Sequence, residues 1–189
     1  MIDKKFIQKL KKDYDKTVGE RRQIISLSNI ALHDSKRVIF ALQRDDIKTA
    51  EIKIGEIERV LIKLEKKFGL SRILEEGSYK AGAEEYVEAK TFYFVVVGKK
   101  ISKFKEVNIT VDSYIGGLCD LTGELVRRAV NRAAAGNLEE VNKIKKIIND
   151  IMAELVEFDM TGYLRTKYDQ AKGNLRKIEQ IDYEIKIRR

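Results

Sequence analysis

The sequence predicts an all-α protein, a bundle of about six to seven long antiparallel helices. Three observations support that class: the chain has no Pro, 36% of its residues are charged, and apolar residues recur at helical spacing along most of its length. With 189 residues, 43% of them hydrophobic, the chain is long enough to build a real core. We therefore expect residues 1–189 to form a single domain.

The first two predicted helices cover residues 3–44 and 46–68. Apolar side chains repeat at helical spacing through the first of them, beginning at Phe6. Asp46 is suited to cap the second helix and Gly69 to end it.

A third helix is predicted over residues 71–100. Ser71 is suited to cap it, and Glu75 and Glu76 suit a first turn, where negative charge meets the helix dipole. Residues 104–110 alternate weakly and contain Val and Thr, so we expect a short extended connection there.

The fourth predicted helix begins at a cap, Asp112 or Ser113, and ends at Ala135 before a Gly-Asn pair. Two further helices are expected over residues 138–157 and 163–187, separated by a break that contains Gly162.

Charge and composition narrow the functional classes. The chain carries 38 Lys and Arg against 30 Asp and Glu, a formal net charge of +8, which favours an anionic partner such as nucleic acid. A single Cys119 cannot form an internal disulfide, and a single His33 excludes a His-rich zinc site, so we assign neither residue any chemistry. Without a signal-peptide pattern or a long apolar segment, the protein is expected to be cytoplasmic, with no membrane partner.

Paired carboxylates occupy two of the predicted helices. Glu85 and Glu88 lie about 60° apart around one helix axis, and Asp120 and Glu124 lie about 40° apart around another. The Gly116–Gly117 pair, one turn before Asp120, leaves room for a neighbouring backbone or a ligand. An all-oxygen ligand set favours Mg²⁺ or Mn²⁺, and hence phosphate chemistry. Spacing alone leaves open that these are solvated charges on amphipathic helices.

The segments Glu85-Tyr-Val-Glu88 and Asp120-Leu-Thr-Gly-Glu124 resemble the two acidic motifs of the translin superfamily, specifically its catalytic (Trax) branch. Further matches extend the resemblance over nearly the whole chain. The resemblance implies a translin-like α-superhelical fold and a hollow octamer that degrades RNA, with metal-binding acidic residues on its inner wall. An aspartate at position 120 favours the catalytic branch.

The resemblance thus implies a metal-dependent endoribonuclease that hydrolyses single-stranded or partly structured RNA with Mg²⁺ or Mn²⁺. Glu88 and Asp120 are expected as direct ligands, and Glu85 and Glu124 as ligands or general base. The chain lacks the family's long insertion between the motifs and its basic N-terminal extension, and Glu84 stands where Gln is common. These departures favour a homo-oligomer, with an octamer expected.

Two rival functions stay open: a non-catalytic oligomer that binds single-stranded RNA or DNA, and a purely structural helical oligomer. Phosphate contacts are expected from six basic residues, of which Arg127 is placed to hold a phosphate oxygen. These are Arg21, Arg22, Lys36, Arg37, Arg44 and Arg127. A solvated face or intersubunit ion pairs would explain them equally well.

Three tyrosines, Tyr79, Tyr86 and Tyr93, recur every seven residues on the third predicted helix. They could stack on bases, but packing in the core or at an interface is the favoured role.

Overall fold

The computed structural model describes residues 1–187, and within that range it contains seven α-helices and no strand. The all-α prediction is therefore confirmed. The helices are α1 (Lys4–Gln43), α2 (Ile47–Phe68), α3 (Leu70–Ile73), α4 (Gly77–Val96), α5 (Val111–Ala134), α6 (Leu138–Leu155) and α7 (Gly162–Ile187).

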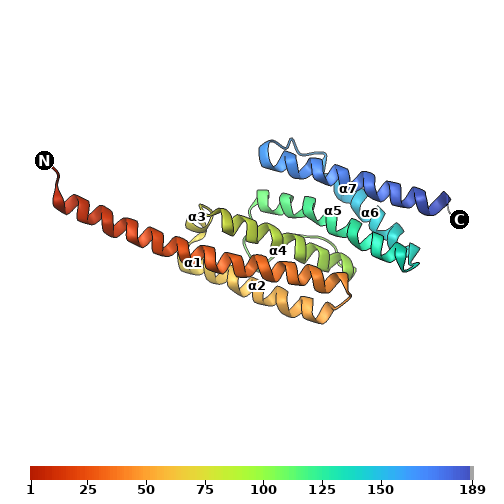
Figure 1. Ribbon diagram of the computed structural model, residues 1–189, viewed down its shortest axis with the longest axis horizontal. Coiled ribbons are helices and arrows are strands. Elements are labelled where there is room, and N and C mark those ends of the chain that lie inside the picture. Colours follow the sequence, from red (N-terminus) through yellow and green to blue (C-terminus); the bar gives the residue numbers. More distant parts are fainter. Residues whose placement is uncertain (188–189) are drawn as a thin grey trace.

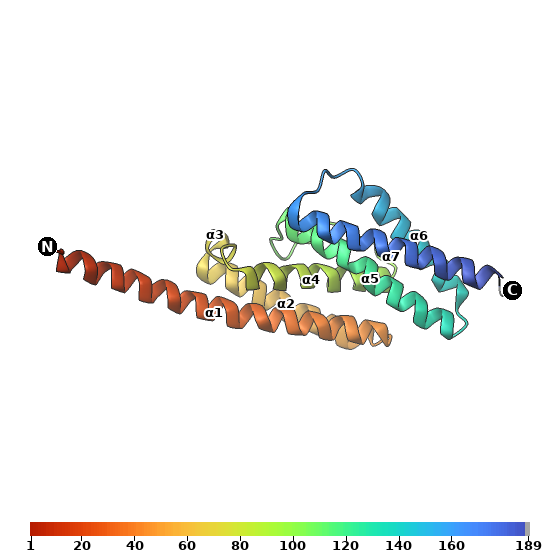
Figure 2. The same ribbon diagram turned by 45° about the horizontal axis from the view of Figure 1, so that its top comes forward.

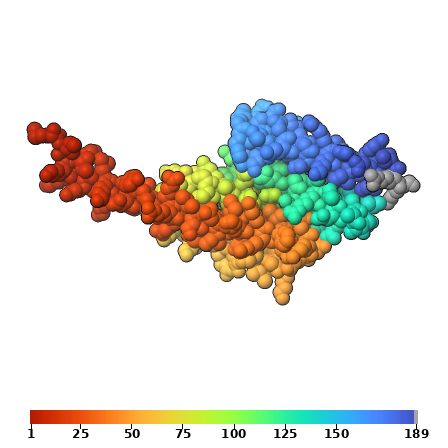
Figure 3. All heavy atoms as spheres, in the orientation of Figure 1, coloured from red at the N-terminus to blue at the C-terminus, as the bar shows by residue number. Residues whose placement is uncertain are grey.

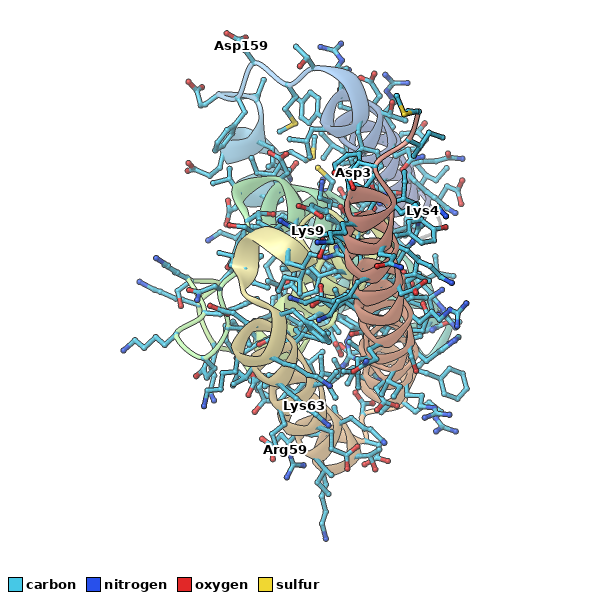
Figure 4. All side chains as sticks on the ribbon, turned by 90° about the vertical axis from the view of Figure 1, so that its left-hand side faces the viewer. Asp3, Lys4, Lys9, Arg59, Lys63 and Asp159 are labelled. Carbon is cyan, nitrogen blue, oxygen red and sulfur yellow. The ribbon has the colours of Figure 1, made fainter. Side chains whose placement is uncertain are left out.

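The helices pack side by side in an elongated body (Figures 1 and 2). Helix α4 lies against α1, α2 and α5, and α5 in turn packs against α6 and α7. The first half of α1 extends beyond the body as an arm (Figure 3). Seen from the end of that arm, Asp3 directly precedes α1, Lys4 and Lys9 lie on α1, and Arg59 and Lys63 lie on α2 (Figure 4).

Polar side chains cap four of the helices, as local chemistry dictates. The Asp46 carboxylate accepts from the Thr49 N–H at 3.1 Å, which confirms the predicted cap of α2. The predicted caps of α5, Asp112 and Ser113, are wrong, because Thr110 Oγ1 accepts from the Ser113 N–H at 3.3 Å and the helix begins at Val111. Each of the three residues can cap a helix, so local pattern alone did not separate them.

The third predicted helix is also wrong at both ends. The chain forms the short α3, turns, and starts α4 only at Gly77, so Glu75 and Glu76 precede the helix. The Glu76 carboxylate is drawn into a buried corner, where it lies 2.9 Å from Arg72 and 3.4 Å from Arg21. Helix α4 ends at Val96, and Gly98 follows with a φ of 73°.

The connection between α4 and α5 is irregular, as expected, but it is packed against the core. Phe104 is buried, with its ring centroid 5.4 Å from that of Tyr86 and 5.2 Å from that of Tyr114. Tyr79, Tyr86 and Tyr93 are likewise buried, so the favoured packing role of these tyrosines is confirmed and they are not free to stack on bases.

Arg128 of α5 makes hydrogen bonds to the end of α1 and to the start of α6. Its side chain is 5% exposed and donates to the Leu42 carbonyl of α1 at 2.8 Å. It also donates to Asp45 at 2.7 Å and to Glu140 of α6 at 2.6 Å. This buried guanidinium therefore anchors the α1–α2 turn to α5 and α6.

Glycines allow α4 to approach its neighbours closely. A Cβ at Gly82 would lie 2.9 Å from the Ser28 carbonyl oxygen of α1, and a Cβ at Gly117 would lie 2.6 Å from Cβ of Val87. The room expected at Gly116–Gly117 is thus filled by α4. None of the helices between residues 1 and 187 is long and apolar enough to span a membrane.

Replacing Gly117 with Ala should destabilise the protein by about 1–3 kcal/mol, because the added methyl group overlaps Val87 and pushes α4 away from α5. The measurement is urea unfolding followed by circular dichroism. Gly55→Ala is the control: its methyl group meets no atom within 4 Å, and it should raise stability by about 0.5–1 kcal/mol. Equal effects of the two substitutions would contradict close packing at Gly117.

Candidate metal centre

The four carboxylates singled out in the sequence meet at one cavity. Glu85 and Glu88 project from α4, and Asp120 and Glu124 from α5, into a space of about 510 Å³ that α1 and α7 complete. The other lining residues are Lys36, Ile39, Phe40, Cys119, Gly123, Arg127, Gln170 and Asn174. The alternative that these are independent solvated charges does not fit this arrangement.

Glu88 is the most deeply placed of the four carboxyls. Its residue is 9% exposed, and its carboxyl group opens onto the cavity without a hydrogen bond to any of residues 1–187. Burial raises the pKa of Glu88 to about 9, and the charges of Asp120, Glu85 and Glu124 add to that effect while Lys167 opposes it. Burial and like charge therefore favour the protonated form of this carboxyl group unless a cation lies beside it.

Glu85 and Glu124 lie nearer the rim. The Lys36 ammonium is 3.8 Å from Glu85, whose pKa is raised by burial against the opposing charge of Lys36. The Glu124 carboxylate accepts from Gln43 of α1 at 2.8 Å and lies 3.5 Å from Arg127. These contacts come from two helices and orient the two carboxylates without neutralising Glu88.

Asp120 already has a cationic partner. Lys167 Nζ, from α7, lies 2.5 Å from Asp120 and 2.7 Å from Glu84, and Tyr163 donates to Glu84 at 2.6 Å. Burial alone would lower the pKa of Lys167, but its hydrogen bonds to Asp120 and Glu84 outweigh burial and raise it. The Lys167 ammonium therefore stays charged and tied to both carboxylates.

The residues fit a hard divalent cation in chemistry but are not assembled around one point. Carboxylate oxygens are the ligands that Mg²⁺ and Mn²⁺ prefer, and Glu88 supplies a buried carboxyl without a partner. As the side chains of residues 1–187 stand, no three acidic, His or Cys residues are gathered closely enough to hold an ion. Binding by Glu85, Glu88, Asp120 and Glu124 would require side-chain rotation, above all of Asp120 away from Lys167.

The six predicted phosphate-binding residues divide into two groups. Lys36 and Arg127 line the cavity. The other four do not line it. On α1, Arg21 pairs with Glu76, Arg22 is exposed, and Arg37 lies 2.7 Å from Asp34. Arg44, which directly follows α1, stacks 4.4 Å from the Phe40 ring centroid. The structure thus brings two of the six to the carboxylates.

Sequence reasoning missed Lys167, Tyr163 and Gln43. Each is an isolated polar residue on a helix surface, and nothing in its local pattern distinguishes it from a solvated side chain. Only the packing of α7 and α1 onto the α4–α5 pair brings them to the carboxylates.

Fold and cavity together define an all-helical protein whose two facing helices present carboxylates to a shared space. The chain belongs to the translin family, whose family model matches residues 19–189.

Relatives named translin-associated protein X align over more of this chain than the relatives named translin that are described below. A translin-associated protein X homolog of Schizosaccharomyces pombe is 26% identical and covers 95% of this chain and 84% of its own length. The chicken translin is 28% identical but covers 49% of this chain and 41% of its own length. An uncharacterized protein of Methanocaldococcus jannaschii is 31% identical over 83% of this chain and 72% of its own length.

Solved structures share the fold over almost the full chain. AfC3PO superposes with a TM-score of 0.88 at 19% identity, covering 97% of this chain and 98% of its own. Apo-NeC3PO superposes with a TM-score of 0.84 at 23% identity, covering 95% and 96%. An AfC3PO–duplex RNA complex superposes with a TM-score of 0.84 at 19% identity and covers 97% of each chain.

Replacing Glu88 with Gln should flatten the pH dependence of stability in the metal-free protein. The folded-state pKa of Glu88, about 9, lies above its ordinary value of 4.5. Between these values the unfolded chain releases a proton that the folded protein keeps, so the free energy of unfolding falls as pH rises, by up to about 1.4 kcal/mol per pH unit.

The measurement is urea unfolding in EDTA at pH 5.5 and pH 8, in which the Glu88→Gln protein should lose less stability than wild type at the higher pH. Glu179→Gln, at an exposed position of α7, is the control and should follow the wild-type curve. Parallel pH dependence in all three proteins would contradict the raised pKa.

Proposed function

We propose that this protein is a metal-dependent endoribonuclease that hydrolyses single-stranded or partly structured RNA inside a hollow homo-oligomer, with an octamer expected. Mg²⁺ or Mn²⁺ would be held by Glu85, Glu88, Asp120 and Glu124. The cytoplasmic location stays a prediction from the sequence.

The observation that carries the proposal is the largely buried Glu88 residue, whose carboxyl group shares one cavity with three other carboxylates and has a raised pKa. A stable core does not gain from such an arrangement, because burial and like charge both destabilise the ionised group. Groups of this kind gather at sites that bind a cation or perform acid–base chemistry.

The residues divide the chemistry among them. When bound, a divalent ion lowers the pKa of a water molecule and offsets the charge that develops on the phosphate. Glu88 and Asp120 would bind the ion from opposite helices. Glu85 or Glu124, nearer the rim, would accept the proton of the attacking water. Arg127 and Lys36 would hold the phosphate oxygens of the substrate and orient the scissile bond.

RNA as the partner is supported by charge and by similarity. The basic side chains Lys36 and Arg127 border the acidic cavity, while Arg37 lies on α1 and Arg44 directly follows its last residue. One solved structure of the same fold is a complex with duplex RNA. Contacts of this kind bind the phosphate backbone without reading sequence.

Self-association is supported by apolar surface that the single chain leaves exposed. Phe6, Leu10 and Tyr14 lie one turn apart on the α1 arm and are 56%, 48% and 69% exposed. Exposed apolar stripes of this kind mark interaction surfaces.

The rival function is non-catalytic binding of single-stranded RNA or DNA. The observation that favours it is the engagement of Asp120 by Lys167, since an ion cannot use that carboxylate oxygen while the pair is formed. The two functions differ in whether bound RNA is cleaved.

Purified protein should cleave a labelled single-stranded RNA with Mg²⁺ or Mn²⁺ but not with EDTA. Glu88→Ala should lower the cleavage rate at least about 100-fold, because it removes a direct ligand. Glu179→Ala, at an exposed position of α7, is the control and should retain wild-type activity. RNA binding with no cleavage under either metal would replace the nuclease proposal with the binding protein.

Replacing Lys36 or Arg127 with Ala should weaken RNA binding about equally for unrelated sequences and reduce its salt dependence, because each would remove one phosphate contact. The RNA affinity and its salt dependence are both measured by fluorescence anisotropy in EDTA. The NaCl concentration is varied from about 50 to about 300 mM, the range over which such contacts are screened. Lys80→Ala, at an exposed position near the start of α4 and outside the cavity lining, is the matched control. An unchanged salt slope in both cavity variants would exclude these side chains from the RNA interface.

A further inference from the structure

Lys167 contacts one of the four cavity carboxylates, Asp120, although Lys167 itself does not line the cavity. It arrives from α7, a helix that carries none of the four proposed ligands, and its Nζ bridges Asp120 of α5 and Glu84 of α4 at 2.5 and 2.7 Å. Its side chain is 18% exposed, so solvent screens these contacts only in part.

The bridge is built into the packing of the site. The Glu84 carboxylate reaches Lys167 by lying over Gly116, where a Cβ would be 2.2 Å from Glu84 Oε2. Tyr163, one turn before Lys167, donates to the same Glu84 carboxylate at 2.6 Å, and its ring lies beneath the Lys167 ammonium at 5.4 Å. Glycine, tyrosine and glutamate together hold the ammonium in one position.

The positive charge of Lys167 acts on the whole cavity. It opposes the rise in the pKa of Glu88 and of Glu85 as well as that of Asp120. The Lys167 ammonium and a divalent ion would therefore compensate the same negative charge. They would also compete for the same carboxylate, that of Asp120.

We propose that Lys167 is a tethered counter-ion that occupies Asp120 in the metal-free protein and is displaced from it when a divalent ion binds, with Glu84 as the carboxylate that receives the displaced ammonium. This inference rests on the proposed function, since it concerns the same metal centre. Lys167 is thus a positioning residue: it acts through Asp120 and sets the metal concentration at which the site fills. Glu84, where the translin resemblance leads one to expect Gln, keeps the ammonium in the cavity.

The test is the affinity for Mn²⁺, measured without RNA by the electron paramagnetic resonance signal of the free ion. Lys167→Met should bind Mn²⁺ at least about tenfold more tightly than wild type, because an ion no longer has to break a charge-assisted hydrogen bond. Lys167→Gln should shift in the same direction, so the result does not depend on how well one variant folds. Lys167→Arg keeps the charge and should stay within about threefold of wild type.

Lys172→Met is the matched control. Lys172 also lies on α7 and also sits over a tyrosine one turn earlier, but it pairs with Asp169 at 2.5 Å and with none of the four proposed ligands. Its replacement should leave the Mn²⁺ affinity unchanged.

The double variant Glu84→Gln with Lys167→Met separates occupation from net charge. It removes one negative and one positive charge, so the cavity keeps its wild-type net charge while Asp120 is freed. Mn²⁺ binding that stays tighter than wild type supports occupation of Asp120, and a return to wild-type affinity overturns it.

The remaining outcomes distinguish this inference from the proposed function. Equal Mn²⁺ affinity of wild type and folded Lys167→Met would overturn the role of Lys167 and leave the nuclease proposal standing. Mn²⁺ binding by neither protein would overturn both. Binding by Lys167→Met alone would support the counter-ion role, because Lys167 would then be the group that keeps Mn²⁺ out of the wild-type site.

Discussion

The close approach of α4 and α5 is the constraint on which the site depends. Two consecutive glycines of α5 face α4, so that Val87 and the Glu84 backbone carbonyl lie where side chains would otherwise separate the helices. Because the two helices approach so closely, the carboxylates that lie one turn apart on each helix face the same space. The cavity is thus a product of backbone packing, and the acidic residues are placed by it.

Packing of this kind creates an electrostatic problem that the neighbouring helices only partly solve. Lys36 and Gln43 of α1 contact Glu85 and Glu124 at the rim, and Lys167 of α7 contacts Asp120, but Glu88 has no such partner among the described residues. The energetic strain is concentrated on one carboxyl, whose pKa is raised to about 9. In the proposed metal centre, a divalent cation beside Glu88 would relieve this strain, which no ion pair of Glu88 among the described residues does.

Helix periodicity and the acidic spacings were readable from the sequence because both are local. The bounds of α1 and α2 followed to within a residue or two, and Glu85, Glu88, Asp120 and Glu124 were placed on facing helices. The break before Gly77 was missed because Glu76 is held by Arg21 and Arg72, and the first of these lies far away in the sequence. Lys167 was missed for the same reason, since its partners lie on two other helices. In both cases the decisive contact joins segments that are distant in the sequence, so no local pattern could indicate it.

Under the proposed function, the division between acidic cavity and basic surface would let one chain bind both a substrate and a metal ion. A net charge of +8 attracts a polyanion over the whole molecule, whereas a cavity lined by carboxylates repels phosphate unless a cation is present. RNA bound by the basic residues would therefore approach the cavity productively only once a metal ion has reversed its local charge. Under the proposed function, metal binding would be the step that couples RNA binding to cleavage, and Lys167 would offset part of the negative charge at Asp120 until an ion binds.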